Sequence, residues 1–116
     1  MIQGIKTLIY PVKDIAQARA LYGRLLGVKP YMDEAYYVGF RVEGQEIGLD
    51  PHAQSQGITM PIAYYQVADI QKSLHSLVEA GAQLVQEPKD VGYGKLIATA
   101  TDADGNLIGL IQLPVK

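Results

Sequence analysis

Two short stretches decide how this sequence is read: Ile9-Tyr10-Pro11-Val12-Lys13-Asp14-Ile15 and, 55 positions later, Tyr64-Tyr65-Gln66-Val67-Ala68-Asp69-Ile70. In each stretch a short apolar run, typical of a strand, leads to an aspartate and then to apolar residues at three- and four-residue spacing. Asp14 and Asp69 are well placed as helix N-caps, because their side chains can accept a hydrogen bond from a free amide of the first turn. The repeat predicts two copies of one strand–helix unit.

Each predicted helix has an apolar face and meets a glycine at its end. The apolar positions are Ile15, Ala18, Leu21, Tyr22 and Leu25 in the first helix, and Ile70, Leu74, Leu77 and Val78 in the second. Gly27 and Gly81 follow these runs, and a glycine in the left-handed conformation commonly closes a helix. Pro30 and Pro88 come soon after and fit a chain that has left the helix.

The two halves also agree beyond the helices. Residues 36–42 and 95–100 are strand-like, and each run turns into a second one, at 46–50 and 107–111. Both second runs contain the tripeptide Ile-Gly-Leu. We therefore predict two modules, residues 1–56 and 57–116, of β-α-β-β type. A module of about 60 residues buries little surface by itself, so the two are expected to share a sheet and a core as a single domain.

Composition excludes several classes of protein. The 116 residues are 48% hydrophobic and 19% charged, with a net charge of −2, which argues against disorder and against a nucleic acid or an anionic membrane as partner. Cysteine is absent, which excludes disulfides, a thiolate zinc site and a cysteine nucleophile. No apolar run approaches the roughly 20 residues of a membrane span, and the N-terminus lacks the long apolar stretch of a signal peptide. We expect a cytoplasmic protein.

The sequence offers little for metal or hydrolytic chemistry. Of the two histidines, His75 falls on the polar side of the second predicted helix and His52 in a polar loop after a strand. No G-x-S-x-G motif occurs, and the glycine-rich Gly92-Tyr93-Gly94 matches neither a P-loop nor a dinucleotide fingerprint. These glycines are typical of turns.

The motifs, taken in order, resemble the vicinal oxygen chelate superfamily, which contains glyoxalase I, bleomycin-resistance proteins and extradiol dioxygenases. The residues that carry the resemblance are Val12 to Asp14, Ala18, Leu21-Tyr22, Leu25-Leu26-Gly27-Val28 and the turn Asp102-Ala103-Asp104-Gly105-Asn106. The resemblance implies an α+β fold of two tandem βαβββ modules. It implies a single eight-stranded, cup-shaped sheet with helices on its outer face, holding a small ligand and often completed by a second chain.

Enzymes of this family hold a divalent metal with side chains from four strand positions. The resemblance places these positions at Thr7, Gly48, Ile62 and Gly109. None of these residues offers an imidazole or a carboxylate, the groups that bind such metals. We therefore expect a family member without the metal ligands, with no metal and no cofactor.

Alternation along strands predicts which residues share a face with those four positions and line the cup. The predicted ligand-binding residues are Thr7, Tyr37, Glu46, Gly48, Asp50, Ile62, Tyr64, Gln66, Tyr93, Gly109 and Ile111. Gly48 and Gly109 leave the floor without side chains, which either makes room for a ligand or lets backbones pack closely. The eight tyrosines, against one phenylalanine and no tryptophan, suit a planar or polar aromatic ligand.

Three residues are candidates for acid–base catalysis. Glu46 and Asp50 are the only carboxylates expected to face the cup, and His52 follows closely. If both carboxylates were buried together, the pKa of one would rise; the alternative is that they lie at strand ends in water. The loop from Pro88 to Lys95 is either a mobile lid or an ordinary connection.

These observations predict a metal-independent small-molecule-binding protein, similar to the bleomycin-resistance branch, that sequesters or senses a small ligand, for example an aromatic one. Two alternatives stay open. One is an enzyme of the same fold, a lyase, isomerase or dioxygenase-like protein, that uses carboxylate or histidine groups. The other is a dimeric interaction module whose cup is filled by its own side chains. We expect a small-molecule ligand and a homodimer, and no nucleic acid or membrane partner.

Overall fold

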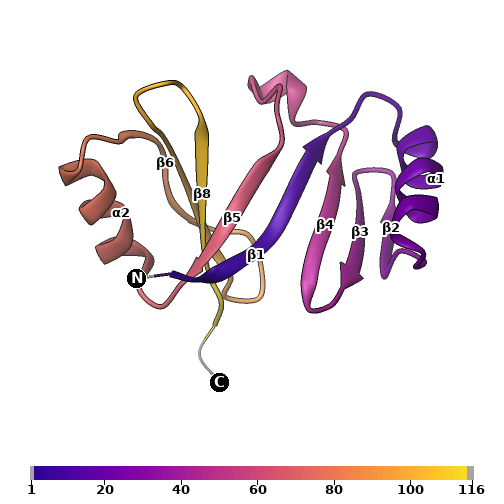
Figure 1. The fold of residues 1–116 in the computed structure, drawn as a ribbon, viewed down its shortest axis with the longest axis horizontal. Coiled ribbons are helices and arrows are strands. Elements are labelled where there is room, and N and C mark those ends of the chain that lie inside the picture. Colours follow the sequence, from indigo (N-terminus) through magenta and orange to yellow (C-terminus); the bar gives the residue numbers. More distant parts are fainter. Residues whose placement is uncertain (1, 115–116) are drawn as a thin grey trace. The chain divides into compact units, whose positions relative to one another are not determined.

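The computed structural model describes residues 2–114 and consists of eight strands, two α-helices and one short 3-10 helix (Figure 1). The first half contains β1 (Ile2–Pro11), α1 (Ile15–Leu26), β2 (Met32–Glu34), β3 (Tyr37–Val42), β4 (Gln45–Asp50) and the 3-10 helix η1 (Gln54–Gln56). The second contains β5 (Ile62–Val67), α2 (Ile70–Glu79), β6 (Gln83–Asp90), β7 (Leu96–Thr101) and β8 (Leu107–Gln112). Each half thus has the element order βαβββ, as predicted.

The strands follow the hydrogen-bonded order β2-β3-β4-β1-β5-β8-β7-β6 in a mixed sheet. β1 pairs with β4 and β5 pairs with β8 in parallel, whereas the β2-β3-β4 and β6-β7-β8 neighbours are antiparallel. These pairings confirm the predicted α+β class and the eight-stranded sheet. Neither helix of the described residues is long and apolar enough to cross a membrane.

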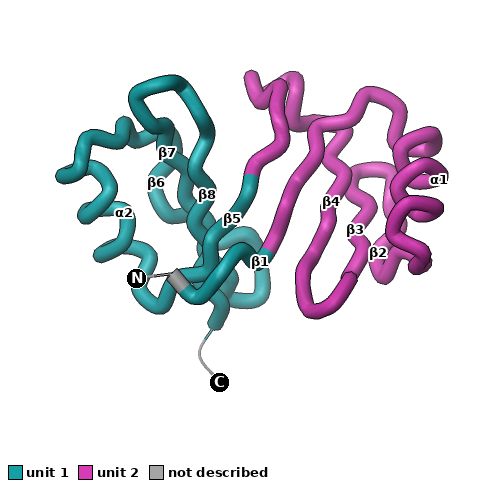
Figure 2. The backbone as a smooth tube through the Cα atoms, in the orientation of Figure 1, with its two compact units in different colours: residues 1–6, 63–116 teal, residues 7–62 magenta. Residues whose placement is uncertain are grey.

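The chain divides into two compact units, shown in different colours in Figure 2. Unit 2 comprises residues 7–62, and unit 1 comprises residues 1–6 together with residues 63–116. The boundary at 6/7 falls inside β1, so the two ends of one strand belong to different units. The compact units therefore have other bounds than the sequence modules, which divide between residues 56 and 57.

In unit 2, α1 packs against one face of β3 and β4. Asp14 caps the helix, its Oδ1 accepting from the Gln17 amide at 3.0 Å, and Gly27 closes it with φ of 71°. The core beneath the helix consists of buried Ala18, Val38, Phe40 and Leu49. Both predicted ends of this helix are confirmed.

Unit 1 repeats this arrangement with α2. The Asp69 Oδ1 accepts from the Lys72 amide at 3.1 Å. The core consists of Val67, Ile70, Leu74, Ala98, Ala100 and Leu110. The C-cap is Ala80 in the right-handed conformation, and Gly81, with φ of 115°, comes one residue later.

The register of the parallel ladders shows the duplication at single residues. Ile9 of β1 lies opposite Gly48 of β4, and Tyr64 of β5 lies opposite Gly109 of β8. Ile9 and Tyr64 open the two quoted stretches, and Gly48 and Gly109 are the central residues of the two Ile-Gly-Leu tripeptides. The repeated motifs thus occupy matching positions in the two units.

The segment expected to be a loop from Pro88 to Lys95 begins later than predicted. β6 continues to Asp90 and accommodates Pro88 through a shift in its pairing with β7 between Gln86 and Lys89. Proline has no backbone N–H group, and it is tolerated at such irregularities because no hydrogen bond to the neighbouring strand is required there. The connection is reduced to residues 91–95, where Tyr93 has φ of 58°.

Candidate functional site

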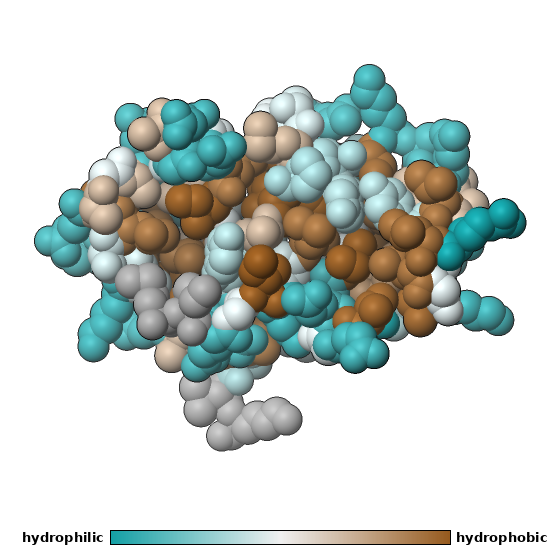
Figure 3. Space-filling view, in the orientation of Figure 1, coloured by the Kyte–Doolittle hydropathy of each residue, from teal (hydrophilic) through white to brown (hydrophobic). Residues whose placement is uncertain are grey.

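Strand alternation gives β3 and β4 of unit 2 two different faces. Val38 and Phe40 of β3 and Leu49 of β4 pack under α1. The residues between them point to the opposite, helix-free face. On that face the register pairs Gly39 with Gly48 and Arg41 with Glu46, and Tyr37 precedes Gly39 by two positions. In the space-filling view, apolar and weakly hydrophilic side chains are intermixed over the region of β2–β4, and more strongly hydrophilic ones lie at the lower ends of these strands (Figure 3).

Gly39 and Gly48 form a side-chain-free floor that two tyrosine rings cover. A Cβ atom on Gly48 would lie 2.6 Å from Ile9 Cδ1 and 2.7 Å from Tyr37 Cζ, and closer still to the Tyr37 hydroxyl oxygen. On Gly39 it would lie 2.8 Å from the Tyr31 ring and 2.9 Å from the Tyr37 ring. The space above Gly48 is therefore filled by the side chains of Tyr37 and Ile9, and not by a closely packed backbone.

A carboxylate lies beside these rings. The Tyr37 hydroxyl donates a hydrogen bond to Glu46 Oε2. Burial, followed by this hydrogen bond and the charge of Glu46, holds the pKa of Tyr37 far above its usual value. The same causes raise the pKa of Tyr31 from 10.0 to about 12, although Arg41 acts in the opposite direction. Both phenols therefore stay protonated at neutral pH.

Arg41 completes the group, which we call the phenol–arginine cluster: Tyr31, Tyr37, Arg41 and Glu46. The Arg41 guanidinium carbon lies 4.0 Å from the centroid of the Tyr31 ring, a cation–π contact. Although Glu46 is its cross-strand partner, no ion pair joins Arg41 to a carboxylate of the described residues. The guanidinium is thus oriented by an aromatic ring, and its charge is not neutralised by an ion pair.

Among the three candidate catalytic residues, only Glu46 belongs to this cluster. Asp50 lies at the end of β4, where its Oδ1 accepts from the His52 amide at 2.8 Å and its charge helps to raise the pKa of Tyr37. His52 is exposed in the following turn, and its carbonyl accepts from the Ser55 hydroxyl at 2.7 Å. Of the remaining predictions in unit 2, Thr7 is buried opposite Glu46, and Ile62 is buried at 1% exposure.

The predicted residues of unit 1 have a different setting. The Tyr64 ring lies over Gly109, since a Cβ atom there would be 2.6 Å from Tyr64 Cδ1. The Gln66 side-chain amide donates to the Gln3 side-chain oxygen at 3.1 Å, and Ile111 is buried. The Tyr93 ring is fully exposed at the tip of the connection between β6 and β7.

The side chains at the family's four metal positions do not fit a divalent metal. Thr7, Gly48, Ile62 and Gly109 together supply one hydroxyl and no imidazole or carboxylate. Throughout residues 2–114, no group of three or more His, Asp or Glu side chains is arranged to hold a metal ion.

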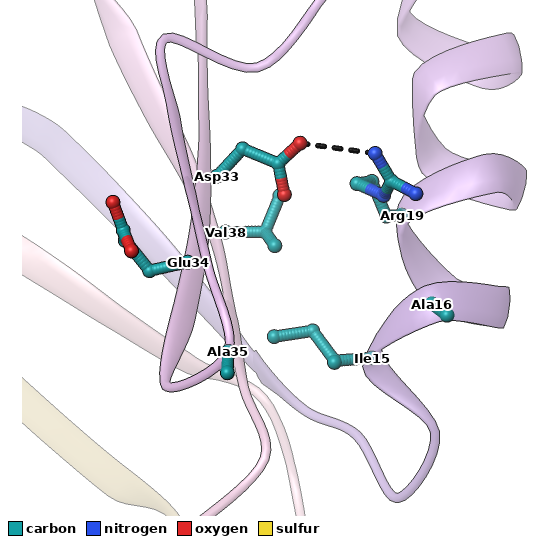
Figure 4. Close-up of a pocket in the computed structure, with 7 residues that line it drawn as sticks. All are labelled: Ile15, Ala16, Arg19, Asp33, Glu34, Ala35 and Val38. Carbon is teal, nitrogen blue, oxygen red and sulfur yellow. Dashed lines mark hydrogen bonds and ion pairs between the residues drawn. The ribbon is translucent and has the colours of Figure 1, made fainter.

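A separate cavity of about 260 Å³ lies on the helix side of unit 2, between α1 and the β2–β3 hairpin (Figure 4). An exposed ion pair spans it, from the Arg19 guanidinium on α1 to Asp33 on β2 at 2.9 Å, while Glu34 points away from the helix. The other lining residues are Ile15, Ala16, Ala35 and Val38. The sequence prediction missed this cavity, since of its lining residues only Ile15 belongs to a motif, and that motif predicts the start of a helix rather than a cavity.

Sequence reasoning also missed Tyr31 and Arg41 as site residues. Arg41 could have been found, because it follows Tyr37 by four positions in a strand and so shares its face. Tyr31 could not, because it precedes β2, a three-residue strand with no alternation of its own.

With this geometry in place, comparison with known proteins identifies the family. The family model described as Glyoxalase/Bleomycin resistance protein/Dioxygenase superfamily matches residues 4–110. The chain belongs to this superfamily, which confirms the resemblance drawn from its motifs. No curated protein matches the sequence.

Solved structures support the same fold at low sequence identity. Methylmalonyl-CoA epimerase from Mycobacterium tuberculosis is 18% identical with a TM-score of 0.70, over 98% of this chain and 90% of that one. A glyoxalase/bleomycin resistance protein/dioxygenase superfamily member from Vibrio splendidus 12B01 is 15% identical with a TM-score of 0.71, over 97% and 99%. The Mn(II)-bound glyoxalase from Novosphingobium aromaticivorans is 18% identical with a TM-score of 0.74, over 96% and 39%. Similarity at this level of identity shows the fold, and the activity has to be inferred from the residues of the site.

Proposed function

We propose that this protein binds a small molecule without a catalytic metal, to sequester or sense it, on the helix-free face of unit 2. The phenol–arginine cluster carries the proposal. Two phenol rings over a Gly39–Gly48 floor provide a flat apolar surface, and Glu46 and Arg41 provide polar groups at its edge. An apolar surface with a few convergent polar groups is the usual composition of a small-molecule site.

The direct test is a ligand screen by thermal shift, with planar acids, amines and neutral aromatic compounds. A ligand present at 100 times its Kd stabilises the folded state by about 2.7 kcal/mol. A compound that binds the cluster loses this stabilisation in Glu46→Gln. The matched control is Glu87→Gln, the same change at an exposed position of β6, which keeps it. Equal shifts in both variants would place the ligand elsewhere.

One observation favours a second candidate, an enzyme of the same fold that transfers protons. The Tyr37 hydroxyl donates to Glu46, so a phenol proton and a carboxylate are already in contact. The test is to incubate each ligand found by the screen with the protein in heavy water and to measure deuterium incorporation by mass spectrometry. Incorporation that disappears in Glu46→Gln supports the enzyme, and no incorporation above the rate without protein supports binding alone.

We also propose that the protein is a cytoplasmic homodimer without a nucleic acid or membrane partner. The net charge of −2 supports the absence of polyanionic partners, and exposed Leu21 and Leu25 on α1 supply apolar surface for contact with a second copy. Light scattering after size exclusion measures the mass directly. A dimer that binds no compound of the screen would favour the interaction module, whose site is filled by its own side chains.

A further inference from the structure

We propose that the ligand of the phenol–arginine cluster is a small amino- or hydroxycarboxylic acid. In this proposal Arg41 binds the carboxylate of the ligand, and Glu46 accepts a hydrogen bond from its amino or hydroxyl group. This inference rests on the proposed function and names the chemical class that the site selects. The sheet brings together one pair of opposite charges, Arg41 and Glu46, that do not form an ion pair with each other.

Arg41 and Glu46 are directly opposite each other in the β3–β4 ladder. Cβ atoms of such partners are about 4.5–5.5 Å apart, and opposite charges placed there commonly interact. Here the guanidinium lies over the Tyr31 ring and the carboxylate accepts from the Tyr37 hydroxyl, so no ion pair forms between them. Two tyrosines thus hold a positive and a negative group side by side without mutual neutralisation.

The guanidinium retains the capacity to bind an acid. One face of the guanidinium lies over the Tyr31 ring, and its five N–H groups lie in the plane of the fork, so that those not engaged by Tyr31 can bind a ligand. That planar fork matches both oxygens of a carboxylate, and stacking on a ring orients it in advance. Because Arg41 is exposed, a ligand reaches it without displacing protein.

Glu46 selects a ligand that also carries a hydrogen-bond donor. The Tyr37 hydroxyl donates to Oε2 and Tyr31 also hydrogen-bonds to Glu46, but a carboxylate has about four acceptor positions over its two oxygens, so it can accept further hydrogen bonds. The other carboxylates of this face are Asp50, which accepts from the His52 amide, and Glu34, which is exposed opposite Tyr37. Three carboxylates against one guanidinium disfavour a ligand that offers only a carboxylate and no hydrogen-bond donor.

A ligand with both groups satisfies the site in full. A plain acid would leave Glu46 facing its charge, and a plain amine would leave Arg41 without a partner. An amino acid or hydroxy acid carries a donor next to its carboxylate, so one small molecule can offer a partner to both side chains of this cross-strand pair. An aromatic substituent on it would then lie against the exposed part of the Tyr31 ring.

The experiment compares five probes that share one phenyl ring, by calorimetric titration of the full chain. Phenylglycine and mandelate carry both groups, phenylacetate only the acid, benzylamine only the amine, and benzyl alcohol no charge. We expect phenylglycine and mandelate to bind at least about tenfold more tightly than the other three, since a hydrogen bond to a charged group contributes a factor of this size. Arg41→Gln should remove the advantage over benzylamine and benzyl alcohol, which lack the acid, and Arg41→Lys should restore part of it. Arg24→Gln, at an exposed arginine of α1, should leave it intact.

The outcomes separate this inference from the function on which it rests. If benzylamine or benzyl alcohol binds as tightly as phenylglycine, or if Arg41→Gln binds all five probes like the parent protein, the ligand class is wrong and small-molecule binding stands. If no probe and no compound of the wider screen binds, the proposed function itself fails. Melting of each variant without ligand shows that a loss of binding is not a loss of fold.

Discussion

Gly48 lies where enzymes of this family carry a metal-binding side chain, and here the Tyr37 phenol covers it. The ring fits only because residue 48 has no Cβ atom, which would lie 2.6 Å from Ile9 and 2.7 Å from the Tyr37 ring. A side chain at this position and the present arrangement of Tyr37 therefore exclude each other.

Gly48→Ala tests this coupling. We expect the substitution to lower the free energy of unfolding by about 1–3 kcal/mol, because an added methyl group in a close-packed region forces its neighbours to move. Urea titration measures the change. In a Tyr37→Ala background the same substitution should cost much less, since the ring that it meets is absent.

Gly23→Ala is the matched control. Gly23 lies inside α1, and the added Cβ atom would meet Phe40 at an ordinary 3.7 Å. Alanine is also the better helix former, by up to about 1 kcal/mol. Stability should stay equal or rise. If Gly48→Ala behaved like this control, the Tyr37 ring would not be fixed over Gly48.

The raised phenol pKa values predict an alkaline limit of stability. Folded Tyr31 ionises only near pH 12, whereas the unfolded chain ionises near pH 10.0. The unfolded state therefore releases the proton first, so the contribution is fully present below about pH 10 and is lost as the pH rises toward about 12. Tyr37, whose pKa is also raised, acts in the same direction.

Melting temperatures recorded between neutral pH and this range measure the effect. The parent protein should lose stability steeply above about pH 10, and Tyr31→Phe, which cannot ionise there, should lose it less steeply. Tyr36→Phe, at an exposed tyrosine without such contacts, should follow the parent curve. Identical curves for all three proteins would show that the cluster does not hold the phenol protonated.

Strand alternation alone explains why three of the predicted ligand-binding residues lie on one face of unit 2. Tyr37, Glu46 and Gly48 share a face because successive strand residues point to opposite sides, and no tertiary detail is needed for that. What Tyr37 contacts was not predictable, since the β3–β4 register and the entry of Tyr31 from a preceding loop decide it. The face on which a strand residue lies follows from alternation within its own strand, whereas the side chains that it contacts depend on which strands pair.

At the scale of elements, the two helix caps are equivalent and should have equivalent energetic weight. Asp14 and Asp69 each accept from the amide three residues ahead, at 3.0 and 3.1 Å. Replacement of either by alanine should lower the free energy of unfolding by about 0.5–2 kcal/mol, and replacement by asparagine, an equally good cap, should change it little. Thermal or urea unfolding of the four variants checks this. An alanine variant as stable as its asparagine counterpart would show that the cap is dispensable.

The strands that could not be predicted from the residue pattern have sequences with little local preference for a strand. β2 has three residues, and β6 is exposed at most positions and contains a proline. Both are strands because a neighbouring strand supplies hydrogen bonds, β3 for β2 and β7 for β6. The helices, by contrast, are marked by caps and apolar spacing within a dozen residues. Elements stabilised by their own sequence were predictable, and those stabilised by a neighbour were not.

At the scale of the whole molecule, the absence of suitable donors at the four family positions predicts that stability is independent of metal. Neither EDTA nor added Ni²⁺, Zn²⁺ or Mn²⁺ should shift the melting temperature, because a ligand stabilises only a folded state that binds it. Metal analysis of the purified protein should find no stoichiometric metal. A stoichiometric ion, or a shift reversed by EDTA, would contradict this and identify ligands outside the four positions.

The division of the molecule makes a last prediction about its halves. The sequence repeat suggests a cut between residues 56 and 57, but residues 1–6 belong to the compact unit of residues 63–116, where the Gln3 side chain accepts from Gln66. The fragment 57–116 therefore lacks part of its own unit, and a chain of about 60 residues has little burial to lose. We expect the full chain to unfold cooperatively and this fragment to show no cooperative transition by circular dichroism. Adding a peptide of residues 1–12 should increase its ordered structure, whereas the same peptide with Gln3→Ala and Ile5→Ala should do so less. A cooperative melt of the fragment alone would mean that the repeated module, rather than the unit completed by β1, is what folds.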